Sequence, residues 1–128
     1  MAATERNWPT VVTELIRLTQ KGAIKWNQMD PPPQLISTSD ATIVSFFSTE
    51  LHGRIVGIYE ERYRTHSFGE TVWDSQIEIA FFTEDWAISW KWPKLEAARD
   101  LMEAVRYQAA DADSFLDAIL KGGGEKNS

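Results

Sequence analysis

Few side chains in this chain could support acid–base chemistry, and the two histidines are the first to consider. His52 precedes a glycine in "LHGR", and His66 lies in the polar stretch "RTHSFGE". A general base must lie within hydrogen-bond reach of the proton that it removes, with a pKa tuned towards the working pH. Both histidines fall in separate predicted loops, and neither has an evident partner beside it. We therefore expect exposed loop histidines, no catalytic residue and a protein that is not an enzyme.

A second group of candidate ligands is acidic and gathers in the region from residue 70 to residue 85. Asp74 and Glu78 are four residues apart, so on a strand they face the same way, with Gln76 between them. Their oxygen atoms would suit a hard cation. The stretch lacks closely spaced ligands supported by glycine, so we expect a solvated strand face, no metal and no cofactor. The chain has no cysteine, which also excludes disulfides and thiolate metal sites.

The stretch "YEERYR" combines aromatic and basic side chains. On a strand, Tyr59 and Tyr63 share one side with Glu61, while Arg62 and Arg64 point to the other side. Aromatic rings beside arginines can stack on bases and pair with phosphates. However, glutamates interrupt the arginines and the formal net charge is -6, which opposes affinity for a polyanion. We expect cross-strand ion pairs here and do not expect a nucleic-acid partner as the main function. Weak nucleic-acid binding through Arg62 and Arg64 is a third alternative, and it predicts an affinity that falls steeply with salt.

These side chains lie in the region 42–92, which alternates with the period of strands. Four segments read as strands of an antiparallel meander: "TIVSFFSTEL", "RIVGIYEERYR", "SQIEIAFF" and "WAISWKW". His52 and Gly53 suit a two-residue hairpin turn. In the last segment Trp86, Trp90 and Trp92 would share one face with Ile88. The short stretch Ile24–Trp26 could add a fifth strand.

Helical periodicity flanks the meander on both sides. "NWPTVVTELIRLTQKG" predicts an N-terminal helix that ends at Gly22, and "KLEAARDLMEAVRYQ" predicts a helix after Pro93. A short second C-terminal helix would add a further apolar edge, which consists of Phe115, Leu116, Ile119 and Leu120. The three prolines in Asp30–Gln34 predict a stiff connector.

The expected fold class is α+β. It has an antiparallel sheet of four to five strands in a meander, with the N-terminal helix and the C-terminal helices packed on one face. At 128 residues the chain forms a single domain, which we expect to span residues 1–121, with a disordered tail at 122–128.

The first predicted strand is apolar on both sides, with Val44 and Phe46 on one side and Ile43 and Phe47 on the other. Such a strand requires cover on both faces, and two helices cover only one. The chain also has six tryptophans, and exposed aromatic patches commonly mark partner surfaces. The sequence thus favours a protein-interaction module that is homodimeric through the second sheet face or a strand edge. The predicted interaction surface comprises Val44, Phe46, Phe82, Tyr59, Tyr63, Arg62 and Arg64.

An alternative of another class is a small-ligand-binding or hydrolytic domain. Its pocket would lie between the sheet and the C-terminal helices and would use Tyr59, Tyr63, His66 and nearby acids. A cleft that converges on His66 would favour this alternative, whereas a flat apolar surface would favour the interaction module.

Two stretches resemble a set of small bacterial proteins of unassigned function. "LTQKGAIKW" matches a helix that ends in a "KGxIxW" turn, and "LMEAVRYQAADADSFLDAIL" matches a closing "LxxAVRxQxxxxDxFLDxIL" segment. The resemblance covers about a third of the chain. It implies the order helix, sheet, helix and a bacterial source, and it implies no activity.

The compartment is predicted from missing signals. The start "MAATERNWP" lacks the apolar core of a signal peptide, and no stretch approaches the roughly 20 apolar residues of a membrane span. We therefore expect a cytoplasmic protein without a membrane partner.

Overall fold

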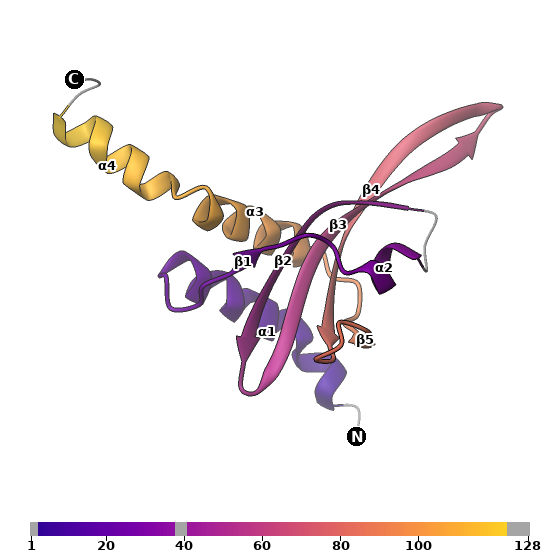
Figure 1. The fold of residues 1–128 in the computed structure, drawn as a ribbon, viewed down its shortest axis with the longest axis horizontal. Helices are drawn as coiled ribbons and strands as arrows, with labels where there is room; N and C mark the ends of the chain where they lie inside the picture. Colours follow the sequence, from indigo (N-terminus) through magenta and orange to yellow (C-terminus); the bar gives the residue numbers. More distant parts are fainter. Residues whose placement is uncertain (1–2, 38–40, 123–128) are drawn as a thin grey trace.

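The computed structural model describes residues 3–37 and 41–122, and its centre is a five-stranded antiparallel sheet (Figure 1). Its elements are α1 (Ala3–Gln20), β1 (Asn27–Gln28), α2 (Pro33–Ser37), β2 (Thr42–Leu51), β3 (Arg54–Ser67), β4 (Glu70–Phe82), β5 (Ile88–Lys91), α3 (Ala97–Ala109) and α4 (Ala112–Gly122). The strands lie in the order β1-β2-β3-β4-β5, so the predicted α+β meander is confirmed. The fifth strand is Asn27–Gln28 and not Ile24–Trp26.

Both long hairpins turn through two residues of positive φ. His52 and Gly53 have φ values of 51° and 76°, as the sequence predicted, because such turns follow the right-handed twist of the strands. Phe68 and Gly69, at 53° and 78°, close the second hairpin. This hairpin is longer than predicted, since β3 continues to Ser67 and includes His66. Its outer half is mostly polar, with Val72 and Trp73 as isolated exposed apolar residues, and therefore shows no hydrophobic alternation.

One face of the sheet, the first face, is covered by α1 and α3. Phe47, Ile58 and Ile79 from the central strands pack against the apolar sides of both helices. The helices contribute mainly Val12, Leu15, Leu101, Met102 and Val105. Burial of such side chains stabilises the fold by roughly 25 cal/mol for each Å² of apolar surface removed from water.

Gln108 of α3 fixes the turn that follows α1. Its Nε2 atom donates to the carbonyl oxygens of Thr19, at 3.1 Å, and Ile24, at 2.7 Å. Its Oε1 atom accepts from the backbone N–H of Trp26 at 2.8 Å. Gly22 provides the positive φ of 79° that the turn requires. The two stretches "KGAIKW" and "AVRYQ" are therefore in direct contact, 82 residues apart at the Trp26 bond.

The opposite side of the sheet, the second face, is covered by the chain itself. Phe46, Tyr59 and Phe82 are buried there beneath Leu35 of α2 and beside the partly buried Trp86. The expectation that this face needs another molecule is therefore corrected around Phe46. The physical reason is that the proline connector turns into α2 at Pro33, and a five-residue helix has too few residues to show a helical period.

A β-bulge in β2 changes which of its residues share a face. Ile43 pairs with Glu61 and Ser45 pairs with Glu60, so Val44 is the extra residue of a β-bulge. Ile43 and Phe46 consequently point to the second face together, whereas the sequence predicted opposite faces.

Trp86 has a positive φ of 66° in the turn before β5. Its ring centroid lies 6.2 Å from that of Phe46 and 5.9 Å from that of Phe82. Trp90 and Trp92 instead meet Trp8 of α1, at 5.4 Å and 4.5 Å. The predicted common face of these three tryptophans in the last strand is thus wrong, because the turn lifts Trp86 off the strand.

The last helix, α4, extends one residue into the predicted tail. Gly122 belongs to α4, so the expected tail cannot begin there, and its remaining residues, 123–128, lie outside the described residues. Within residues 3–37 and 41–122, no helix is long and apolar enough to cross a membrane.

Candidate functional site

The predicted interaction residues occupy very different environments. Phe46, Tyr59 and Phe82 are buried, so they offer no surface to a partner. Val44, the bulge residue, is exposed. The prediction of a single apolar surface through Phe46 and Phe82 is therefore corrected, because α2 and Trp86 already cover it.

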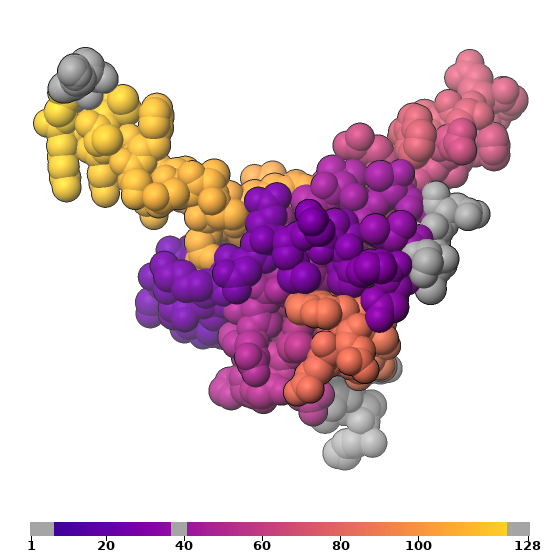
Figure 2. Space-filling view, viewed as in Figure 1, coloured from indigo at the N-terminus to yellow at the C-terminus, as the bar shows by residue number. Residues whose placement is uncertain are grey.

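The arginines lie on the hairpin arm formed by the outer halves of β3 and β4. Arg62 and Arg64 are exposed, and the Cζ atom of Arg64 lies 5.4 Å from the ring centroid of Trp73. His66 is exposed nearby, with its Nδ1 atom 3.2 Å from the hydroxyl of Thr71. Figures 1 and 2 show this arm standing away from the body of the protein.

The residues of the small-ligand alternative do not converge. In the strand register Tyr59 and Tyr63 face the second side of the sheet, whereas His66 alternates to the first side. The groove at the C-terminal helices lies between the end of α1 and the α3–α4 joint, and none of these three residues lines it. Its charged lining residues include Lys21, Lys25, Arg99, Asp100, Glu103 and Asp113. A catalytic arrangement centred on His66 therefore lacks geometric support.

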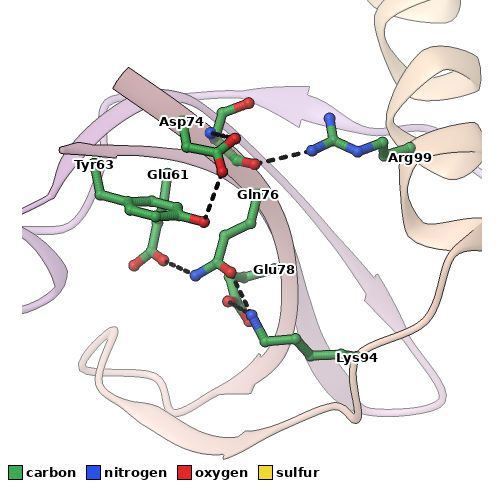
Figure 3. A network of polar contacts seen from close by, with 8 residues as sticks. Glu61, Tyr63, Asp74, Gln76, Glu78, Lys94 and Arg99 are labelled. Atoms are coloured by element: carbon green, nitrogen blue, oxygen red, sulfur yellow. Dashed lines mark hydrogen bonds and ion pairs between the residues drawn. The ribbon is translucent and has the colours of Figure 1, made fainter. Parts of the chain in front are cut away.

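Polar side chains instead gather on the second face, next to the aromatic core. Tyr59 pairs with Glu78 across β3 and β4, Glu61 pairs with Gln76, and the next pair in the register is Tyr63 with Asp74. Alternate residues of paired strands point to one face, so all six side chains share one surface. Figure 3 shows five of them, without Tyr59. The sequence grouped Asp74, Gln76 and Glu78 correctly.

The acids of this group differ in exposure. Asp74 is exposed as predicted, but Glu61 and Glu78 retain only 7% and 4% of their accessible surface. The expectation of a solvated strand face is therefore wrong for Glu78. Strand alternation identifies which residues share a side and contains no information on what covers that side.

Hydrogen bonds join the group into a network. Gln76 donates from Nε2 to Glu61 Oε1 at 2.8 Å, and Lys94 donates to the Oε1 atom of Gln76. The Nζ atom of Lys94 also lies 3.2 Å from Glu78 Oε2. Lys94 follows β5 in the chain and reaches Gln76 and Glu78 on β4 (Figure 3).

Tyr59 lies at the buried end of the network. It is fully buried, and its hydroxyl has no hydrogen-bond partner among the residues that the structure describes. Burial raises the pKa of the Tyr59 phenol, and the charges of Glu61 and Glu78 raise it further. The phenol is therefore neutral at physiological pH. Among the described residues no group of three acids or histidines could hold a metal ion.

The largest departure from expectation is α4. The sequence predicted that its apolar residues would add an edge to the core, yet no residue of this helix is buried against the described part of the chain. Its four large apolar side chains are exposed: Phe115, Leu116, Ile119 and Leu120. We call these four residues the α4 face.

The direction of α4 has a local cause. Asp111 adopts a positive φ of 55°, which ends α3 because a residue in this conformation cannot continue a right-handed helix. The Asp111 carboxylate then accepts from the hydroxyl of Ser114 at 2.9 Å. Tyr107 donates to Asp113 across the joint at 2.9 Å. Figures 1 and 2 show that α4 consequently leads away from the sheet and forms a second arm opposite the hairpin.

Comparison with protein-family models, with curated proteins and with solved structures finds no match for this chain. Two features of the described residues stand out instead. They are the exposed α4 face and the hydrogen-bonded group of Glu61, Gln76, Glu78 and Lys94 on the second face.

Proposed function

We propose that this protein is a protein-interaction module that associates with a second copy of itself through the α4 face. The observation that supports this proposal is a set of four large apolar side chains on an arm with no residue buried against the described part of the chain. Phe115 and Leu120 retain 66% and 79% of their accessible surface. Contiguous apolar patches on soluble proteins usually mark contact sites.

The length of α4 also favours a partner. An isolated helix of 11 residues is only marginally stable in water, because nucleation is costly and few hydrogen bonds follow. Most helical stability in proteins comes from packing of an apolar side. Contact along the α4 face would supply that packing.

The polarity of α4 favours a second copy in antiparallel orientation. Asp117 and Lys121 lie on the side of the helix away from the α4 face, so both charges stay in water when two α4 faces meet. In an antiparallel pair the positive end of each helix dipole lies beside the negative end of its partner's dipole, which is favourable. A two-fold axis between the copies would make the contact self-complementary.

The test is the mass of the particle in solution, measured by sedimentation equilibrium at micromolar concentration. We expect a dimer for the wild-type chain and a monomer for the double variant Leu116→Asp with Ile119→Asp, whose circular dichroism should remain that of a folded protein. The matched control is Val72→Asp on the hairpin arm, since Val72 and Leu116 retain 47% and 45% of their accessible surface. This control should remain dimeric.

A charge variant on the other side of α4 is a second control. Lys121 lies opposite the α4 face, so Lys121→Glu should leave the dimer unchanged. A wild-type chain that is monomeric at these concentrations, or a double variant that remains dimeric, would refute the proposal.

A further inference from the structure

We propose that the second face also holds a binding site for an organic cation with several N–H donors, either a guanidinium or a primary ammonium group. The site consists of the carboxylates of Glu61 and Glu78 with the hydroxyl of Tyr59. It uses none of the residues of the α4 face and does not depend on self-association.

The charges of the network are not balanced. Glu61 and Glu78 are both almost fully buried, and a buried carboxylate is costly unless a cation or several donors compensate it. Lys94 is the one cation in ion-pair contact with either carboxylate in the part of the chain that the structure describes. Its side chain remains 70% exposed. Among the described residues, Glu61 accepts only from the neutral amide of Gln76. One solvated ammonium thus serves two buried acids.

The Tyr59 hydroxyl is a second and independent sign of an incomplete site. A buried polar group without a partner is costly, so native proteins rarely leave one unpaired. Tyr59 pairs in register with Glu78, and Glu61 is the next residue of β3 on the same side, so the phenol and both carboxylates lie on one side of the sheet. In the proposed site the Tyr59 hydroxyl oxygen accepts from a ligand whose other N–H groups point at the two carboxylates.

The combination of groups selects the chemistry of the ligand. Two carboxylates and a phenol oxygen are all acceptors for N–H donors, and a guanidinium presents five such donors in one plane. The described residues offer no third acid or histidine that would complete a metal site. The rings of Tyr59 and Phe46 stack at 5.7 Å and are fully buried, so packing fixes the orientation of the phenol.

Lys94 marks the route into the site. Its ammonium group occupies the position on Glu78 and Gln76 that a ligand cation would take. A shallow hollow at the edge of β4, lined by Gln76, Lys94 and Glu96 among others, adjoins this position. Displacement of the exposed Lys94 side chain would therefore admit a ligand without unfolding the sheet.

The probes are ethylguanidinium and ethylammonium, each titrated into isotopically labelled protein and followed by NMR. We expect saturable shifts of the Tyr59 ring and the Gln76 side-chain amide, with ethylguanidinium the tighter ligand. Glu61→Gln and Glu78→Gln should each weaken binding at least tenfold, and Tyr59→Phe several-fold. The control Glu50→Gln, at an exposed position of β2, should leave binding unchanged.

A variant that retains both acids is also needed, because loss of a buried acid could weaken binding by disturbing the fold. Lys94→Ala removes the competing ammonium and should tighten ethylguanidinium binding several-fold. Shifts that do not saturate, equal shifts in the wild type and Glu78→Gln, or weaker binding by Lys94→Ala would each overturn the proposal.

Discussion

The helices α3 and α4 follow one another in the chain and are both amphipathic, yet their apolar sides have opposite fates. In α3 five residues are buried, whereas in α4 none is buried against the described part of the chain. The difference arises at Asp111, whose positive φ turns α4 away before it can reach the sheet. The comparison teaches that helical periodicity predicts an apolar side, while the backbone between two helices decides whether the same chain covers it.

The strongest test of this contrast removes a leucine from each helix. Leu101 is fully buried, so Leu101→Ala should lower the free energy of unfolding by about 4 kcal/mol, since it loses apolar contacts and leaves a cavity. Leu120→Ala should change it by less than about 0.5 kcal/mol when measured on the monomer. Urea denaturation at low protein concentration measures both. Equal losses for the two variants would mean that α4 is packed as α3 is.

A second test concerns the bonds that hold α3 against the end of α1. Gln108→Ala should lower the free energy of unfolding by about 2 kcal/mol, because three backbone groups lose their partner. Gln20→Ala, at an exposed position of α1, is the control and should change it little. Thermal unfolding followed by circular dichroism distinguishes them. A Gln108→Ala protein as stable as the control would show that water replaces these bonds fully.

A third test asks how closely the second face is packed. It is either covered, as the apolar side of α3 is, or open, as the apolar side of α4 is. A Cβ atom on Gly57 would lie 2.5 Å from Phe82 and 2.9 Å from Phe46. Gly57→Ala should therefore cost about 1 to 2 kcal/mol through overpacking. Gly122→Ala meets nothing within 4 Å in the described structure and should cost little. An unchanged denaturation midpoint for Gly57→Ala would indicate that the aromatic side chains there are loosely covered.

The smallest expected effect is on the loss of stability at alkaline pH, where the buried Tyr59 is compared with the exposed Tyr107. The pKa of Tyr59 is raised above its ordinary value of 10.0 by burial first, so the folded chain keeps the phenol proton after the unfolded chain has lost it. This contribution to stability is complete below pH 10 and declines as the pH rises above that value. Tyr59→Phe should therefore flatten the alkaline decline in urea unfolding.

Tyr107 is the matched comparison, because its pKa is raised mainly by its exposed hydrogen bond to Asp113. Solvent screens that bond, so Tyr107→Phe should flatten the decline less than Tyr59→Phe does. The reverse order would show that Tyr59 is accessible to hydroxide in the folded state.

Much of the fold could be predicted from the sequence. Alternation in β2, β3 and β4 and the pair His52–Gly53 indicated the meander, because a half-buried strand leaves a period of two. Three features left no such period. The polar outer hairpin has no apolar side, α2 is too short to repeat, and the bulge at Val44 shifts the alternation by one residue.

The candidate sites could be predicted only in part. The sequence placed Tyr59, Glu61, Asp74 and Glu78 on common strand sides, which the register confirms. It could not predict that Glu61 and Glu78 are buried, since burial depends on elements distant in the chain. It also could not predict that α4 is left uncovered, because a positive φ at an aspartate has only a weak sequence signal.

The Gln108 contacts have a consequence for the order in which the protein is made. They join positions separated by 82, 84 and 89 residues, so they cannot form until Gln108 has left the ribosome. Until then α1 and the completed strands have no α3 to close over them, and the first face stays open to water. Contacts over such long separations form slowly, because closing the loop costs chain entropy before any contact stabilises it. The interval between the release of β4 and the release of α3 is thus the one in which the nascent chain is most exposed to aggregation.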